Sequence, residues 1–265
     1  MLFIQISYLQ TLKYLFLRSI KITTPGLKDK MINSLIWSTL NIIIFTYVMP
    51  HMGFNKDLGT FMVATMPASC AFFTTINSLY TLLSDISGEG SNLTYELILP
   101  IPQWLVFTKY AFENMFQALS VSIMIIPLGK LLLWNNFSLA YFSFFKFYFL
   151  LVIASTFFGF FSIFITSITH DVYSGLDNVW IRVIFPMWFL GGFQFSWKTL
   201  HSISPVIAFI NLLNPLTFAL EGSRAAALNP ELSLPYWYCI GALLIFTFVF
   251  GYFGIKNLKK RLDCL

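Results

Sequence analysis

The chain has 265 residues, of which 57% are hydrophobic, 19% are aromatic and 10% are charged, and its mean hydropathy is +0.75. Soluble domains carry about 25% charged residues, so this composition excludes a water-soluble globule. The net charge of +5 does not indicate nucleic-acid binding, because more than half of the 16 Lys and Arg residues lie in the two tails. We therefore expect one all-α integral membrane domain over residues 1–265.

The N-terminal segment has the pattern of an amphipathic helix. Its apolar residues between Leu2 and Ile20 recur at i, i+3 and i+4 spacing and alternate with polar residues such as Lys13 and Arg18. The pattern predicts an interfacial helix within residues 1–28 that lies on the cytoplasmic surface of the membrane. We expect no removable signal peptide, because a basic leader and a small-residue cleavage site are both missing.

Six apolar runs are long enough to span a bilayer, which takes about 20 residues. The third contains Glu113, and the fifth contains Asp177 and Arg182 near one end. The predicted spans are Met31–Pro50, Leu58–Ser84, Trp104–Leu128, Tyr141–Thr169, Leu176–Phe195 and Pro235–Ile255.

A seventh charge-free run, Thr199–Leu220, is interrupted by Pro205, Asn211, Asn214 and Pro215. Counting it as a span would put the two basic tails on opposite sides of the membrane, against the positive-inside tendency. We therefore predict a broken or re-entrant pair of short helices within an outer segment, 196–234.

Six spans place both termini in the cytoplasm. The segments 84–103 and 170–176 are then cytoplasmic loops, and 51–57 and 129–140 lie outside together with 196–234. The expected location is the inner, or plasma, membrane.

The loop 84–103 contains signals for a short helix. Ser91 or Asn92 can cap its start, and Pro100 and Pro102 stop it after about two turns. One interpretation is an ordinary turn between two spans. The other is a docking helix that offers Leu93 and Leu97 on one face, with Glu96 beside them, to a soluble partner.

In the outer segment, Asn214 and Pro215 form a good helix start, and Glu221 and Arg224 are spaced to pair on one face. The pair is either a solvated ion pair on an interfacial helix or part of an exit gate. Glu113 likewise has two interpretations, a residue of a transport path or a structural hydrogen bond, since a charge inside a span is costly. We expect Arg182 to snorkel to the cytoplasmic surface.

Motifs for catalysis or nucleotide binding are missing from the sequence. Gly129 and Lys130 do not belong to a P-loop, and the loop residues His170, Asp171 and Asp177 match no hydrolase or protease motif. The three cysteines, Cys70, Cys239 and Cys264, lack the spacing of a disulfide framework or a metal site. We expect no catalytic residue, no metal and no cofactor bound by this chain.

Three segments resemble the ABC-2 family of permeases, the membrane subunits of ATP-binding-cassette exporters of polysaccharides, lipo-oligosaccharides and drugs. Thr94-Tyr-Glu-Leu-Ile-Leu-Pro-Ile-Pro102 is similar to the family's coupling segment, although Leu93 replaces its glycine. Pro186-Met-Trp-Phe-Leu-Gly-Gly192 resembles the fifth span. Asn214-Pro-Leu-Thr-Phe-Ala-Leu-Glu-Gly-Ser-Arg224 resembles the segment before the last span.

The resemblance implies six spans, an N-terminal elbow helix, outer re-entrant helices and a homodimer. It also implies two cytoplasmic ATPase subunits, which bind the ATP and Mg²⁺, and an aromatic-lined channel of the kind found in the family's polysaccharide exporters. The residues expected to couple to the ATPase are Leu93, Thr94, Glu96, Leu97 and Pro102. Those expected in the path or outer gate are Glu113, Asn214, Pro215, Glu221 and Arg224.

The expected function is therefore the permease subunit of an exporter that moves an amphipathic or glycan-bearing molecule outward. The alternative is a stand-alone ion-coupled carrier, for which the sequence lacks evident inverted repeats.

Overall fold

A computed structural model describes residues 8–55, 57–87, 92–98, 101–134, 141–169 and 173–263. This described part is helical and contains no strand. The elements are α1 (Tyr8–Ile43), η1 (Ile44–Val48), α2 (Met49–His51), α3 (Leu58–Ile86), α4 (Asn92–Ile98), α5 (Gln103–Ser122), α6 (Ile125–Leu133), α7 (Phe144–Ile168), α8 (Tyr173–Val179), η2 (Trp180–Ile184), α9 (Phe185–Leu190), α10 (Trp197–Ile203), α11 (Pro205–Asn211), α12 (Pro215–Ala227), η3 (Pro230–Leu232) and α13 (Tyr236–Asp263).

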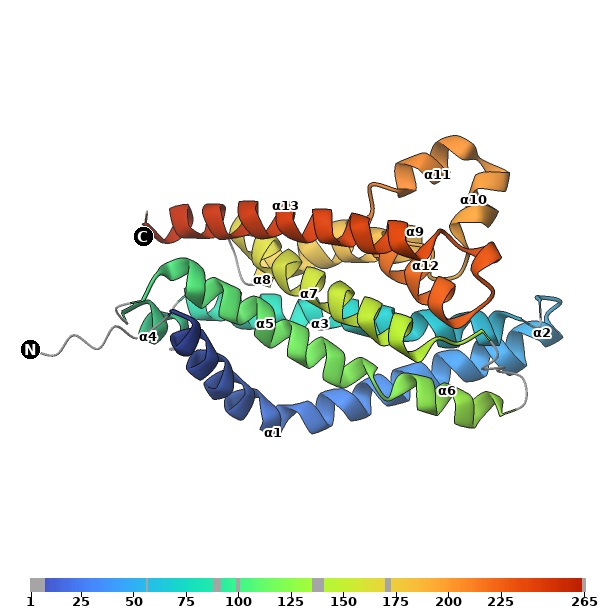
Figure 1. Cartoon of the computed structure of the whole chain (residues 1–265), viewed down its shortest axis with the longest axis horizontal. Coiled ribbons are helices and arrows are strands. Elements are labelled where there is room, and N and C mark those ends of the chain that lie inside the picture. The colour runs from blue at the N-terminus through green and yellow to red at the C-terminus, as the bar shows by residue number, and fades with distance from the viewer. Residues whose placement is uncertain are drawn as a thin grey trace, which may run out of the picture.

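The long helices form an elongated bundle with two distinct ends (Figure 1). The start of α1, the end of α13 and α4 lie together at one end, which we call the terminal end. The helices α2, α10, α11 and α12 lie at the opposite end. The chain thus returns to the end at which it started.

Among the described residues, five helices are long and apolar enough to cross a membrane, or six if one bent pair counts as a span. The predicted multi-pass, all-α membrane architecture is confirmed at this level. The five helices are Thr23–His51, Leu58–Ile86, Gln103–Leu133, Phe144–Ile168 and Tyr236–Leu262.

The fifth predicted span, Leu176–Phe195, is not among these five helices. Its residues form a helical run through α8, η2 and α9, which begins at Tyr173 and ends at Leu190. The run ends at Leu190 because Gly191 and Gly192 follow, and Gly192 takes a φ of +84°, a left-handed conformation that ends a helix and favours glycine. Asp177 and Arg182 are exposed along it.

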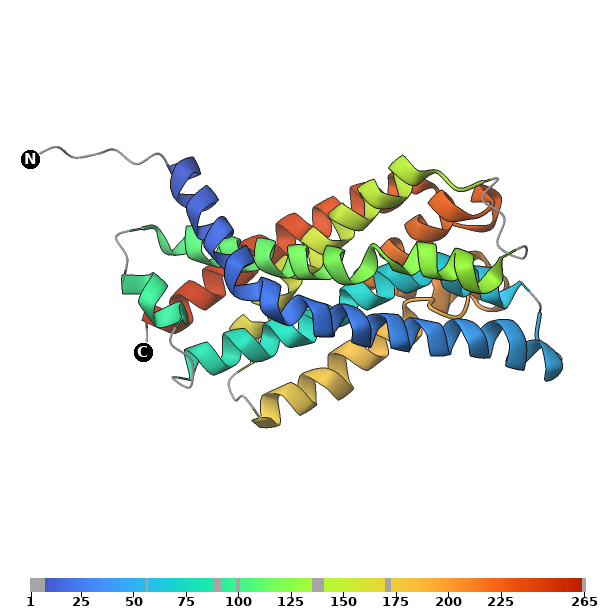
Figure 2. The same cartoon turned by 90° about the horizontal axis from the view of Figure 1, so that it is seen from below.

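The N-terminal helix is longer than predicted. Instead of an interfacial helix followed by a separate span, α1 is one continuous helix with Pro25 inside it. Figure 2 shows that α1 bends along its length, and an internal proline is a common cause of a bend because it removes one backbone hydrogen bond. Its faces also differ from a simple amphipathic pattern, because Leu15 and Ser19 are buried inside the protein whereas Tyr14 and Leu17 are exposed.

The predicted broken helix pair is confirmed. α11 and α12 are bent by 99° across a short break, so the run Thr199–Leu220 is not one straight span. Ser204 caps the start of α11 and Asn214 caps the start of α12, each followed by a proline at the first helical position.

The core of the bundle is rich in phenylalanine and is centred on α7. Phe157 and Phe158 are fully buried there, and Phe158 meets Phe72 of α3 edge to face. Gly159 lets α5 approach closely, because a Cβ atom at this position would clash with the carbonyl oxygen of Ala111.

Candidate functional site

The short helix α4 at the terminal end packs its apolar side into the bundle. Leu93 is 1% exposed and lies in a cluster with Val106 and Phe107 of α5 and Leu258 of α13. Leu97 is half-buried against the same cluster. The face that the sequence analysis assigned to a partner is therefore covered by the chain itself.

Glu96 is also buried, and it is the acceptor in an ion-pair network. Its side chain is 1% exposed and lies 2.9 Å from Nζ of Lys109, which is itself 4% exposed. Arg18 of α1 approaches the same carboxylate at 3.4 Å. Glu96 was predicted to be offered to a soluble partner together with Leu93 and Leu97, but it is buried and both of its cationic neighbours belong to this chain.

The network continues along α5 to the middle of α1. Lys109 lies 3.5 Å from Glu113, one turn further along α5. Glu113 accepts a hydrogen bond of 2.8 Å from the hydroxyl of Thr23. One turn beyond, Gln117 accepts a hydrogen bond of 2.6 Å from Nζ of Lys30. The geometry of Glu113 matches the structural-hydrogen-bond interpretation.

We call this set the polar ladder: Arg18, Thr23, Lys30, Glu96, Lys109, Glu113 and Gln117. It ties α4 to two long helices at once, because a charged group that moved away would leave a buried partner unpaired. Among the α4 side chains that the structure describes, Tyr95, at 54%, and Ile98, at 78%, remain exposed. Arg18 lies over the Tyr95 ring, 5.0 Å from its centroid.

The remaining predicted coupling residues are Pro102 and Thr94. Pro102 is the residue before α5, and its extended backbone ends the connection from α4. Thr94 lies within α4. His170, Asp171 and Cys264 fall outside the described residues.

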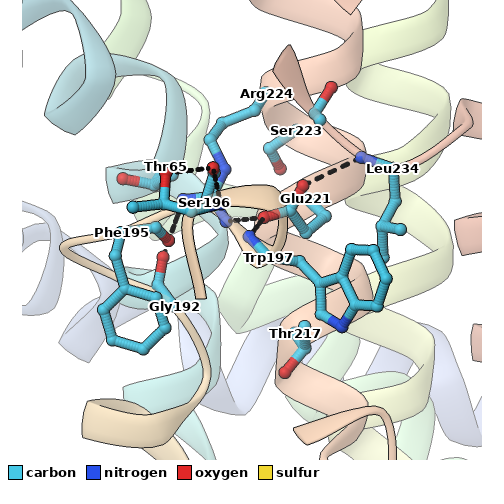
Figure 3. A network of polar contacts seen from close by, with 12 residues as sticks. Thr65, Gly192, Phe195, Ser196, Trp197, Thr217, Glu221, Ser223, Arg224 and Leu234 are labelled. Atoms are coloured by element: carbon cyan, nitrogen blue, oxygen red, sulfur yellow. Dashed lines mark hydrogen bonds and ion pairs between the residues drawn. The ribbon is translucent and has the colours of Figure 1, made fainter. Parts of the chain in front are cut away.

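At the opposite end, Glu221 and Arg224 form a buried ion pair rather than a solvated one. Their atoms are 2.7 Å apart, and their side chains are 0% and 2% exposed. Arg224 also donates to the carbonyl oxygens of Gly192, at 2.7 Å, and Phe195, at 3.1 Å (Figure 3). Its guanidinium lies over the ring of Phe61.

Glu221 receives backbone hydrogen bonds from two other segments. Its carboxylate accepts from the N–H of Trp197, at 2.6 Å, and from the N–H of Leu234, at 2.9 Å (Figure 3). We call Glu221 and Arg224 with these four backbone partners the outer clasp. It joins α12 to the turn after α9, to the start of α10 and to the entry of α13.

Asn214 and Pro215 lie at the start of α12, the helix that carries the clasp, and have structural roles there. Asn214 donates to the carbonyl oxygen of Met187 at 2.7 Å and caps α12 through its side-chain oxygen. Pro215 is buried at the start of α12. These residues were predicted to form a transport path or outer gate together with Glu113. In the structure, Glu113 belongs to the polar ladder and not to the clasp.

An aromatic groove of about 490 Å³ opens between α1, α3 and the α8–α9 run. The indole N–H of Trp188 donates to the hydroxyl of Ser69 at 2.8 Å, which fixes one wall. We call this the aromatic groove, and its lining is Lys30, Asn33, Ser34, Trp37, Cys70, Phe73, Thr74, Asn77, Val121, Trp180, Phe185 and Trp188.

Sequence reasoning did not identify Lys109 or the aromatic groove. Lys109 lies four residues before Glu113 and could have been found from that spacing, because such pairs share a helix face. The groove had no comparable signal, since its rings come from α1, α3, η2 and α9, and aromatic residues occur throughout the sequence.

Within the described part of the chain there is no cluster of three or more His, Cys, Asp or Glu side chains that could hold a metal ion. Cys70 and Cys239 are buried free thiols. A scan against protein-family models and a search of the curated proteins found no match to this chain.

Proposed function

We propose that this chain is the transmembrane permease subunit of an ATP-driven exporter of the ABC-2 type. The observation that carries the proposal is the attachment of α4 through the polar ladder. A force applied to the exposed side of α4 would reach α1 and α5 together, because Glu96, Lys109 and Glu113 are held by short contacts inside the bundle. A flexible loop would dissipate that force.

In this proposal the energy comes from two copies of a cytoplasmic ATPase, which bind the ATP and Mg²⁺. The sequence supports this division, because it contains no P-loop. The ATPase would contact Tyr95 and Ile98, and not the buried Leu93, Leu97 and Glu96. Aromatic and aliphatic anchors of this kind often dominate the energy of small interfaces.

The proposed path for the substrate is the aromatic groove, completed by a second copy of the chain. Its rings suit the apolar part of an amphipathic or glycan-bearing molecule, and Lys30, Asn33 and Asn77 add polar contacts. The groove is supported as the path by its position beside the polar ladder, since Lys30 belongs to both.

The proposed location is the inner membrane, with both termini in the cytoplasm. The basic residues of the two tails support this orientation, because positive charge is enriched on the cytoplasmic side. The terminal end would then face the ATPase, and the outer clasp would stabilise the exit side.

Replacement of Ile98 by Asp tests the proposed docking surface. We expect Ile98→Asp to release the ATPase that co-purifies with the tagged wild-type chain from native membranes, because loss of an exposed apolar anchor costs about 1–2 kcal/mol or more of binding. Leu232→Asp, a matched change at an exposed leucine of η3, is the control. Full retention of the ATPase by Ile98→Asp would contradict the assignment of the docking surface.

The alternative function, a stand-alone ion-coupled carrier, is tested by a separate reconstitution experiment. If the purified chain, reconstituted alone in liposomes, drives transport with an ion gradient and no ATPase co-purifies from native membranes, the exporter proposal is wrong. We expect no transport and no ATP hydrolysis by the isolated chain.

A further inference from the structure

Among its described lining residues, the aromatic groove contains one charged side chain, Lys30. Lys30 belongs to the helix Thr23–His51, which is long and apolar enough to cross a membrane. A charge at membrane depth is costly, and such residues usually face a polar cavity or bind a ligand. The Nζ atom of Lys30 stays within the bundle, where it donates to the buried Gln117 at 2.6 Å.

Lys30 forms no ion pair within the described part of the chain. Glu113 acts on it electrostatically, but that carboxylate is held by Lys109, at 3.5 Å, and by the hydroxyl of Thr23, at 2.8 Å. Gln117 is neutral and occupies one of the three N–H donors of the ammonium group. An anionic group in the groove would therefore give Lys30 a counter-charge and a second hydrogen-bond acceptor.

The groove changes from polar to aromatic along α1. Lys30, Asn33, Ser34 and Trp37 all line it and are spaced three or four residues apart, so they share one face of the helix. Since α1 starts at the terminal end, Lys30 is the member nearest to that end and Trp37 the member farthest from it (Figure 1). On α1 the groove thus has a cationic end and an aromatic end.

α3 repeats this polarity on the opposite wall. It runs antiparallel to α1, and Ser38 of α1 contacts Cys70 of α3 at 3.4 Å (Figure 1). Two turns closer to the terminal end, this register brings Asn77 of α3 opposite Lys30. Phe73 lies one turn from Asn77, toward the aromatic end. Both walls therefore place their polar side chains at the same end of the groove.

The aromatic end is a wall of rings that hold one another in place. Phe73 contacts both Trp180 and Trp188, with centroids 6.0 Å and 5.6 Å apart. Trp180 also meets Phe185 edge to face at 4.9 Å. Trp37, 46% exposed, borders the open side. Rings that are already ordered lose little entropy when an apolar chain packs against them.

We propose that the aromatic groove binds an acidic membrane lipid, with its anionic headgroup at Lys30 and one apolar chain along the rings. Asn33 and Asn77 flank the headgroup and can donate to its oxygens through their amides. Lys30 is then the residue that sets specificity, because a zwitterionic headgroup brings a cation of its own. This inference rests on the groove as the proposed path, for which it names the charge of the bound molecule.

The experiment uses the full chain in nanodiscs that contain equal amounts of dioleoylphosphatidylglycerol and dioleoylphosphatidylcholine. These lipids have the same chains, so native mass spectrometry of the lipids retained by the released protein reports selection by the headgroup alone. The wild type should retain mainly phosphatidylglycerol. Lys30→Gln should lower the ratio of the two lipids roughly fivefold, and Lys30→Arg should restore it. Lys28→Gln, at an exposed position outside the groove lining, is the matched control.

A second pair of variants tests the aromatic end. Trp37→Ala should reduce the retention of both lipids and leave their ratio unchanged, because the ring contacts the chain and not the headgroup. Trp104→Ala, at an exposed position outside the groove lining, should retain both lipids as the wild type does.

Three results would overturn the proposal: equal retention of the two lipids by the wild type, an unchanged ratio in Lys30→Gln, or an equal fall of the ratio in Lys28→Gln. The last would assign the selection to the general positive charge of the tails. The measurement contains no ATPase, so its outcome is separate from the co-purification that tests the exporter function.

Discussion

Two buried carboxylates, Glu96 and Glu221, lie at opposite ends of the bundle and have different kinds of partner. Glu96 is paired mainly with the side chains of Lys109 and Arg18. Glu221 is paired with one side chain, Arg224, and with two backbone N–H groups. The first arrangement joins helices through side chains, whereas the second holds irregular backbone that lacks partners in a helix.

Removal of the Glu96 carboxylate should destabilise the protein strongly. Glu96→Ala leaves the buried Lys109 with the longer contact to Glu113 and the ring of Tyr110, and loss of one partner of a buried pair costs about 3–5 kcal/mol. Unfolding of the purified chain in mixed micelles, followed by circular dichroism, measures this effect.

The matched variant removes both charges. Glu96→Leu with Lys109→Met should restore most of the stability, because well-packed apolar residues often replace a buried ion pair at little cost. Equal stability of Glu96→Ala and the wild type would show that the ladder contributes nothing to holding α4.

At the scale of helices, close packing depends on small residues at the crossing points. α5 and α7 cross where Gly159 contacts the backbone at Ala111. Small residues at such positions allow helices to approach closely in membranes. The two helices have different roles. α5 carries residues of the polar ladder, and α7 packs against α3 and α13 in the core.

Gly159→Ala should separate α5 from α7. The new methyl group would overlap the Ala111 carbonyl oxygen, which cannot rotate away, so we expect a loss of about 1–3 kcal/mol of stability. Gly241→Ala is the control, because a Cβ atom at Gly241 meets no atom within 4 Å. Thermal unfolding of the two variants should differ clearly, and similar behaviour would argue against close packing at Gly159.

In the bent pair α11–α12, local sequence signals set where each helix begins, and tertiary contacts set how α12 packs. Ser204 with Pro205 and Asn214 with Pro215 fix where the two helices begin, so the break was predictable. The outer clasp then fixes how α12 sits against α10 and α13. The partners of the clasp are backbone groups, which no residue pattern identifies in advance.

For the whole molecule, the terminal end carries both tails, and the outer clasp lies at the other end (Figure 1). A membrane around the long axis of the bundle would place these ends in different compartments. The basic residues of the tails favour the cytoplasm for the terminal end.

Cysteine labelling of whole cells tests this topology. In a Cys264→Ser background, Glu231→Cys should react with a membrane-impermeant maleimide, and Lys259→Cys should react only after the cells are opened. Both replaced side chains are exposed, whereas the remaining cysteines, Cys70 and Cys239, are buried. Labelling of both positions from outside would contradict the predicted topology, in which six spans place both termini in the cytoplasm.

The sequence alone determined the all-helical membrane class, most of the span positions, the break between α11 and α12, and the existence of α4. These features depend on local hydropathy and on capping residues, which act within a few positions along the chain. Only the tertiary structure decided that Leu93, Leu97 and Glu96 face inward, that Glu221 and Arg224 are buried, and that twelve residues form the aromatic groove. Burial and pairing depend on helices distant in sequence, such as α1 against α5, and hydropathy gives no information about which faces those helices turn toward each other.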